Sequence, residues 1–250
     1  MKKRRWFSLF LSFALLLPLF SLTSADAYED FTLDAKAGLL IEADTGEILY
    51  EKNAHQENFP ASLTKVMVAL LVFEAIDEGK IALTDSVTAT ESAFEGLSSD
   101  GSTANIVPGE TMTVEQLLNC MLIVSANEAC NILGETLYGS VDAFVARMNE
   151  RATELGCEHT HFANATGLHN SQHYTTAWDL YLITREAMKH DKFMEICNSK
   201  SYTVPATNMT DKPRELHSTN FLISNWRARG YVYRDAQGIK TGSTEEAGHC

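Results

Sequence analysis

A mostly apolar run from Val66 to Ile76 constrains the fold of this 250-residue chain more than any other stretch. It follows directly on residues 59–65 (FPASLTK), which place Pro60 just ahead of it. Proline is tolerated in the first turn of a helix, because the first backbone N–H groups have no intrahelical partner there. The pattern therefore predicts a buried helix that begins near Pro60, runs to about Asp77 and ends near Gly79.

Ser62 and Lys65 lie in the first turn of this predicted helix and share one of its faces, because they are three residues apart. A serine hydroxyl needs a base to become a good nucleophile, and a lysine serves when burial or a nearby cation lowers its pKa. The positive end of the helix beside them favours an anionic oxygen. The same pair is also typical of an ordinary helix N-terminus, so other motifs have to decide between the two interpretations.

The first 27 residues have the organisation of a secretory signal peptide. Residues 2–5 are basic, Trp6 to Leu22 is apolar, and Ala25-Asp26-Ala27 is a small-x-small cleavage site. We expect cleavage before Tyr28 and export to the cell envelope, at the outer face of the cytoplasmic membrane, or to the medium. An uncleaved anchor is the alternative, but the run is short for a membrane span.

Composition and charge narrow the class of protein. With 45% hydrophobic and 21% charged residues the chain can bury a sizeable core. A net charge of −13 argues against nucleic-acid binding and against simple electrostatic binding to anionic lipid. The five cysteines are odd in number and form no C-x-x-C pair, and the length of the chain and its low cysteine density exclude a small disulfide-stapled scaffold. We expect Cys120 and Cys130 to be buried free thiols.

The chain reads as strands, then many helices, then strands. The first strands are a predicted hairpin at 37–50 around the turn 44–46. Predicted helices follow at 111–121, 128–138, 143–155 and 178–189, and predicted short strands at 83–90, 216–225, 231–232 and 238–243. This order predicts an α/β (α+β) fold, in which the first and last strands meet in one antiparallel sheet with helices packed around it.

Three short motifs stand in order along the chain: Ser62-x-x-Lys65, Ser125-Ala126-Asn127 and Lys240-Thr241-Gly242. The first and third each occur once, whereas Ser-x-Asn also occurs at Ser218-Thr219-Asn220. The chain thereby resembles the penicillin-recognising serine enzymes, whose motifs are S-x-x-K, S-x-N and K-T-G. More narrowly, it resembles the low-molecular-mass penicillin-binding proteins, the serine-type D-alanyl-D-alanine carboxypeptidases. The spacing of that family selects Ser125, which follows Ser62 by 63 residues.

The resemblance extends from about residue 37 to residue 250 and includes the segments 162–168 (FANATGL), 173–177 (HYTTA) and 238–242 (GIKTG). It implies a β-lactamase/transpeptidase-like catalytic domain at 28–250 that is C-terminally incomplete. The family continues with further sheet strands, a basic residue that helps to bind the substrate carboxylate, a second β-rich domain and an amphipathic helix. Membrane association is therefore expected only through that C-terminal segment, which is absent here.

The resemblance also implies a reaction. Ser62 would attack the carbonyl between the two terminal D-alanines of a peptidoglycan pentapeptide, with Lys65 as general base. Ser125 would relay a proton to the leaving amine, and the backbone N–H groups of Ser62 and Ser243 would form the oxyanion hole. β-Lactam antibiotics would acylate the same serine. No cofactor is implied.

The remaining site residues would bind the substrate. By resemblance, Asn127 would orient Lys65 and bond the substrate amide. Lys240 and Thr241 would hold the terminal carboxylate, and Gly242 would keep the strand surface open for the peptide.

Other serine chemistries fit the sequence less well. No G-x-S-x-G surrounds any serine, as a Ser-His-Asp hydrolase of that type would require. A class A β-lactamase usually has Asp where Ala126 stands, and no clear loop glutamate is present, although Glu158 lies in a polar segment. Penicillin-sensing domains share the motifs but acylate once and stay blocked, and membrane helices normally tether them.

A metal site is a further alternative. Five potential ligands crowd into seventeen residues: Cys157, His159, His161, His169 and His173. However, the sequence contains no H-E-x-x-H, and the family resemblance accounts for His173 as part of a structural loop. We expect no metal.

Overall fold

The apolar run after Pro60 forms helix α2 (Lys65–Asp77), preceded by the 3-10 turn η2 (Ala61–Thr64). The computed structural model describes residues 33–250, and residues 36–250 form the unit considered below. The predicted signal peptide lies outside the described residues. Every side chain from Lys65 to Phe73 is at most 3% exposed, as expected of a helix that is apolar on all faces. The prediction of a buried helix is confirmed, although its first turn is 3-10 rather than α-helical.

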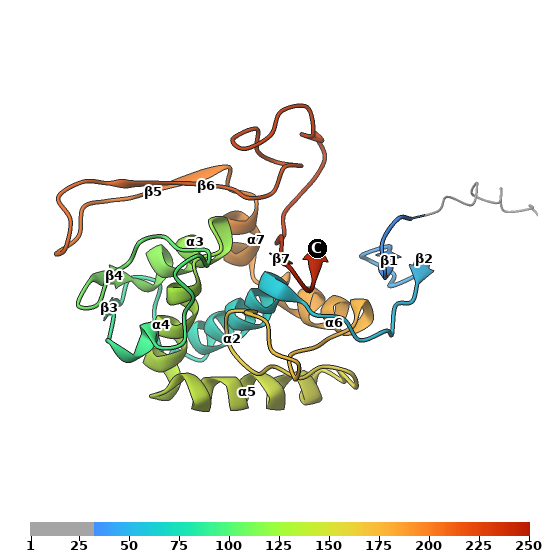
Figure 1. Cartoon of the computed structure of the whole chain (residues 1–250), viewed down its shortest axis with the longest axis horizontal. Helices are drawn as coiled ribbons and strands as arrows, with labels where there is room; N and C mark the ends of the chain where they lie inside the picture. The colour runs from blue at the N-terminus through green and yellow to red at the C-terminus, as the bar shows by residue number, and fades with distance from the viewer. Residues whose placement is uncertain (1–32) are drawn as a thin grey trace, which may run out of the picture. The chain divides into compact units, whose positions relative to one another are not determined.

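Helix α2 lies in the middle of the helical part of this unit (Figure 1). It contacts four of the other helices: α3, α4, α5 and α6. The helices around it are α3 (Val114–Ile123), α4 (Asn127–Tyr138), α5 (Val141–Glu154), α6 (Ala177–Ala187) and α7 (Asp191–Cys197). Because α2 is enclosed in this way, its N-terminal turn is held by the core of the unit.

Helix α3 begins three residues later than the sequence predicted. Residues Thr111–Thr113 form strand β4, and Thr113 is the N-cap of α3. Its side chain accepts from the Gln116 N–H (3.2 Å) and the Gln116 side chain accepts from the Thr113 N–H (2.8 Å). This capping box satisfies two otherwise unpaired N–H groups. Pairing of β4 with β3 (Ser86–Thr88) keeps the preceding residues extended.

The strands form four antiparallel pairs within residues 33–250. These pairs are β1 (Gly38–Ile41) with β2 (Ile48–Lys52), β3 with β4, β5 (Ser201–Val204) with β6 (Arg214–His217), and β7 (Ser243–Thr244) with β8 (Gly248–His249). The mixed class of helices with antiparallel strands is confirmed, as is the hairpin predicted at 37–50.

The expected single sheet of first and last strands is wrong for the described residues. Gly242 exchanges two backbone hydrogen bonds with Cys250 (3.1 and 2.9 Å). The last strands therefore pair with each other and not with β1. The strand predicted at 231–232 is also wrong, because those residues are exposed and irregular. Among residues 33–250 no helix has the length and apolar character needed to cross a membrane.

Candidate active site

The three sequence motifs converge at the first turn of α2. Ser62 lies in η2, the Ser125–Asn127 motif lies where α3 gives way to α4, and Lys240–Gly242 leads into β7. Hydrogen bonds join these segments: Lys65 Nζ lies 2.9 Å from Asn127 Oδ1, and Lys240 Nζ lies 3.0 Å from Ser125 Oγ. Side chains from distant parts of the sequence thus form one polar site at the edge of the core.

The Lys65 amine has three partners and no exposure to solvent. Its Nζ lies 2.9 Å from Ser62 Oγ, 2.9 Å from Asn127 Oδ1 and 2.6 Å from the Thr166 carbonyl oxygen. Burial lowers the pKa of Lys65, against the opposing effect of nearby acidic groups. A neutral amine has two N–H donors and one lone pair. In that state the two carbonyl oxygens would use both donors, and the lone pair would be free to accept the Ser62 hydroxyl proton.

The Thr166 carbonyl is a site group that the residue types do not reveal. A turn built by Asn164 presents it to the amine. Asn164 Oδ1 accepts from the N–H groups of Thr166 (3.1 Å) and Gly167 (2.8 Å), and its Nδ2 donates to the Leu168 carbonyl (2.9 Å). The sequence signalled this segment only as part of the family resemblance, because a backbone carbonyl has no residue-type signature.

Two glycines let the backbone approach the nucleophile closely. A Cβ on Gly167, which has φ +85°, would lie 1.9 Å from the Ala61 carbonyl oxygen. A Cβ on Gly242 would lie 3.1 Å from both the Pro60 oxygen and the Ser62 nitrogen. Gly242, predicted to keep the surface of a strand open, therefore lies directly against the Ser62 backbone.

Ser125 lies in a left-handed turn with φ +66° and is 5% exposed. The turn is held at both sides: the Ala126 N–H donates to the Cys120 carbonyl (3.1 Å) and the Asn127 N–H donates to the Ser102 carbonyl (2.9 Å). The second Ser-x-Asn, Ser218-Thr219-Asn220, lies beside the segment that carries Lys240: the Thr219 hydroxyl bonds Thr241, and Asn220 Nδ2 donates to the Gly238 carbonyl (2.6 Å).

Lys240 and Thr241 are less buried from solvent than Lys65. Lys240 is half-buried, and its Nζ donates to Ser125 Oγ and to the Thr241 carbonyl (2.8 Å). Burial, reinforced by the Lys65 amine, lowers the pKa of Lys240 to about 7. The Thr241 hydroxyl shares a hydrogen bond of 2.7 Å with the Thr219 hydroxyl. Thr219 therefore lies beside the site, a position that the sequence did not predict for it.

Ser243 is exposed and begins β7. Because Gly242 and Cys250 exchange both of their hydrogen bonds, Ser243 and His249 form a pair without ladder hydrogen bonds. The Ser243 N–H therefore points away from β8. It follows directly on the glycine that contacts the Ser62 nitrogen.

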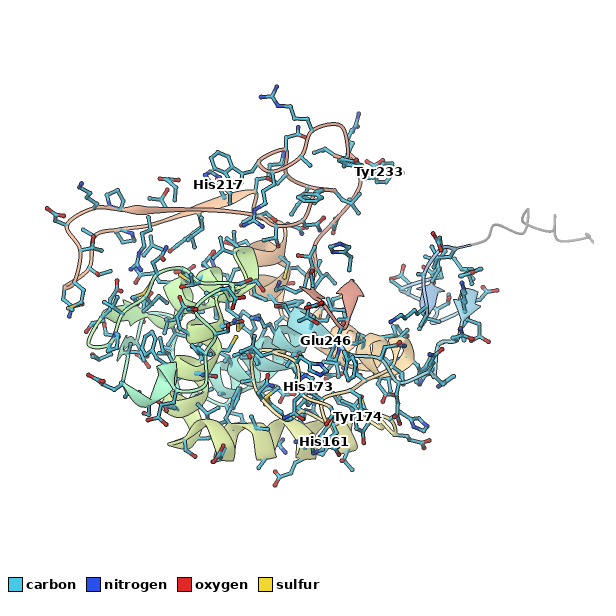
Figure 2. The ribbon with its side chains drawn as sticks, viewed as in Figure 1. His161, His173, Tyr174, His217, Tyr233 and Glu246 are labelled. Carbon is cyan, nitrogen blue, oxygen red and sulfur yellow. The ribbon has the colours of Figure 1, made fainter. Side chains whose placement is uncertain are left out.

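The histidines and the cysteine that crowd into residues 157–173 form no cluster of metal ligands in the described part of the chain. All five cysteines are free; Cys120 and Cys130 are buried, as predicted, and burial raises their pKa values to about 12 and about 11. Within residues 33–250 no three His, Cys, Asp or Glu side chains are disposed to hold a metal ion. His161, His173 and Tyr174 belong to the connection between α5 and α6 (Figure 2).

Comparisons with known proteins identify the family of the chain. Residues 23–250 match the model of a protein family described as D-alanyl-D-alanine carboxypeptidase, peptidase S11. The D-alanyl-D-alanine carboxypeptidase DacF of Bacillus subtilis is 39% identical over 217 residues, which are 87% of this chain and 53% of the relative. The D-alanyl-D-alanine carboxypeptidase of Streptomyces sp. K15 is 31% identical over 239 residues, covering 91% of this chain and 78% of the relative.

A solved structure extends the similarity to the fold. The crystal structure of the Streptomyces K15 DD-transpeptidase superposes with a TM-score of 0.78 at 31% identity, covering 89% of this chain and 85% of that one. The chain spans about half the length of several curated relatives that it matches. On the family match over residues 23–250, the chain belongs to the D-alanyl-D-alanine carboxypeptidase family, peptidase S11.

Proposed function

We propose that this chain carries the catalytic domain of an exported serine carboxypeptidase, which removes the terminal D-alanine from peptidoglycan stem peptides through an acyl-enzyme on Ser62. One observation carries the proposal: Ser62 Oγ lies 2.9 Å from the buried Lys65 amine, whose other hydrogen bonds both end on carbonyl oxygens. This is the arrangement of a nucleophile with its base. Family membership supports the same chemistry.

In the acylation step, Ser62 Oγ attacks the carbonyl carbon of the penultimate D-alanine while Lys65 Nζ takes the hydroxyl proton. The N–H groups of Ser62 and Ser243 bind the oxyanion that forms. Removal of one such donor costs roughly 2.7–4 kcal/mol of transition-state stabilisation. The close approach of Gly242 to the Ser62 nitrogen is consistent with this pairing.

Collapse of the tetrahedral intermediate breaks the peptide bond and needs a proton on the leaving nitrogen. Ser125 relays this proton: it gives its hydroxyl proton to the leaving nitrogen and receives in its place the proton that Lys65 took from Ser62, so that both groups return to their starting states. The Lys240 Nζ–H that donates to Ser125 Oγ stabilises the negative charge that develops there. Water then hydrolyses the acyl-enzyme and releases the shortened peptide.

Recognition of the substrate rests on its free C-terminus. Lys240 supplies a positive charge and Thr241 a hydroxyl donor to the terminal carboxylate, and Asn127 bonds the substrate amide. A β-lactam presents a similar carboxylate beside a reactive carbonyl, so we expect it to acylate Ser62 as well.

Mass spectrometry of the intact protein after exposure to penicillin tests the proposal. We expect a covalent adduct in the wild type and in the control Ser201→Ala, which removes an exposed hydroxyl on β5, and none in Ser62→Ala. An adduct that persists in Ser62→Ala contradicts the assignment of the nucleophile.

Turnover separates the proposed enzyme from its alternatives. We expect catalytic release of D-alanine from a diacylated L-Lys-D-Ala-D-Ala peptide. Stoichiometric labelling without release of D-alanine favours a penicillin sensor. Rapid hydrolysis of the β-lactam with no action on the peptide favours a β-lactamase-like hydrolase.

Export is proposed from the leader at residues 1–27. Expression with the leader in a bacterial host should give an exported product whose N-terminal residue is Tyr28. A product that retains Met1 and stays in the membrane fraction would instead indicate an uncleaved anchor.

A further inference from the structure

A buried network of hydrogen bonds ends on Ala61, the residue directly before the nucleophile. It runs from Ala163 through His173 and Thr64 to Ala61, and His173 is only 2% exposed. His173 lies in the connection between α5 and α6 (Figure 2). We propose that His173 acts through Thr64 as a positioning residue for the reaction at Ser62, an inference that rests on the function proposed above.

The hydrogen bonds of this network all run in one donor-to-acceptor direction, from Ala163 to Ala61. The Ala163 N–H donates to His173 Nδ1 (3.1 Å), and a backbone N–H can only donate, so Nδ1 carries no proton. The proton of the neutral ring is therefore on Nε2, which donates to Thr64 Oγ1 (2.7 Å). Thr64 uses its own hydroxyl proton to donate to the Ala61 carbonyl (2.8 Å). Each group in the chain has one role, set by the group before it.

The surroundings keep the ring neutral, as this direction requires. Burial, together with the nearby His161, Lys65 and His169 side chains, lowers the pKa of His173 to about 4. Phe162 packs against the ring edge-on, with centroids 5.7 Å apart. At neutral pH the ring therefore keeps one donor and one acceptor, both satisfied by the protein.

The hydrogen-bond network ends at Ala61, whose backbone has a rare conformation. Ala61 has φ +47°, in the left-handed region that a residue other than glycine adopts only where its surroundings hold it. Its carbonyl oxygen receives the Thr64 hydroxyl and lies against Gly167, which has no room for a Cβ. The peptide group formed by this carbonyl carries the Ser62 N–H. The Thr64 hydroxyl therefore fixes the plane of the peptide from which the nucleophile projects.

A tilt of this peptide moves both the Ser62 N–H and the Ser62 hydroxyl, which lies 2.9 Å from Lys65 Nζ. Misplacement of a reacting group by about 1 Å can cost on the order of 10²-fold in rate. Both ring nitrogens of His173 bond protein groups, so the ring has no atom left for the substrate. Its effect on the reaction is through position alone.

The test compares variants at Thr64 and His173, the two side chains of the hydrogen-bond network, with a matched control. Thr64→Val keeps the shape of the side chain and removes the hydroxyl, His173→Leu removes the donor to it, and Thr64→Ser restores the hydroxyl. The control Thr160→Val removes a hydroxyl from the same loop, one that bonds Thr175 and Asp179 at 2.7 Å and does not reach Ala61. Circular dichroism melts establish which variants are folded at the assay temperature.

We expect Thr64→Val and His173→Leu to lower kcat and the rate of acylation by penicillin by about 10- to 100-fold, with KM within about threefold of the wild type. The double variant should be no slower than the slower single variant, because both act through one chain. Thr64→Ser and Thr160→Val should stay within about threefold of the wild type.

Two results overturn the inference. The first is a Thr64→Val variant that folds and is acylated at the wild-type rate, while the wild-type protein releases D-alanine. In that case the proposed function stands and the positioning role of His173 and Thr64 does not. The second is a crystal structure of Thr64→Val in which Ala61 keeps its positive φ and Ser62 Oγ stays at hydrogen-bond distance from Lys65. This crystal structure tests the positioning role independently of activity. An inactive wild-type protein would contradict the proposed function alone.

Discussion

The two halves of the site differ in how the protein holds them. The nucleophile half, with Ser62, Lys65 and Asn127, is built on η2, α2 and α4, and the Lys65 and Asn127 side chains are at most 5% exposed. The carboxylate half, with Lys240 and Thr241, lies on irregular backbone that leads into a two-residue strand. Elements packed in a core position a reacting group more accurately than loops do. Substitutions in the first half should therefore affect the chemical step, and those in the second half mainly substrate binding.

The largest expected effect is loss of the base. Lys65→Met replaces the amine by an apolar side chain of similar size, and a circular dichroism melt establishes whether the variant is folded, because the Asn127 and Thr166 oxygens lose their donor. Without the base, acylation by penicillin should fall by about 10⁴-fold or more, measured by stopped-flow labelling. The control Lys200→Met, at an exposed position, should acylate at the wild-type rate. Equal rates in the two variants would remove Lys65 from the mechanism.

The next effect comes from the backbone of β7. Ser243→Pro removes the N–H assigned to the oxyanion hole, and it lies at an edge strand where proline is tolerated. We expect kcat for release of D-alanine to fall by about 10²–10³-fold. Ser243→Ala keeps the N–H and should stay within about twofold. A similar loss in both variants would show that the Ser243 hydroxyl, not its N–H, is the important group.

The pH dependence of kcat/KM tests the role of Lys240 in the carboxylate half. The pKa of Lys240 is about 7, so its amine is cationic below pH 7 and neutral above it. Because the cation binds the substrate carboxylate, kcat/KM should decline above pH 7, and this limb reports the free enzyme. In Lys240→Arg the guanidinium stays charged, so the decline should disappear even if the absolute rate is lower. An unchanged descending limb in Lys240→Arg would assign that titration to another group.

The smallest effect is expected at Thr241. Its hydroxyl already shares a hydrogen bond with Thr219, so it contributes one neutral donor to the carboxylate. Thr241→Val should raise KM by about 5- to 10-fold, the value of one hydrogen bond of roughly 1 kcal/mol, with kcat almost unchanged. Thr219→Val serves as the control for the shared bond. A fall in kcat instead of a rise in KM would place Thr241 in the nucleophile half.

Much of the nucleophile half could be predicted from the sequence. Local rules place Pro60 at a helix start and bury the apolar run after it, and three residues of spacing put Ser62 and Lys65 on one face. The left-handed Ser125 and the donors that fix its turn could not be predicted. They depend on carbonyls at Cys120 and Ser102 that only the folded backbone brings near.

The carboxylate half was predicted less well. The motif Lys240-Thr241-Gly242 was found, but its placement in a sheet shared with the first strands was wrong. Strand pairing between distant segments follows from the competition among all available edges, and here Gly242 pairs with Cys250. The contact of Thr241 with Thr219 likewise has no signal in the spacing of the sequence.

By itself, the sequence determined the order of the three motifs and the buried helix that follows Pro60, because motif order, proline geometry and an apolar run are properties of the chain that need no tertiary contact. The tertiary structure decided the rest. It buries the Lys65 amine, points two carbonyl oxygens at it, and holds Ala61 in a left-handed turn through Thr64 and His173. These features depend on burial and on backbone groups from distant segments, which no pattern of residue types encodes.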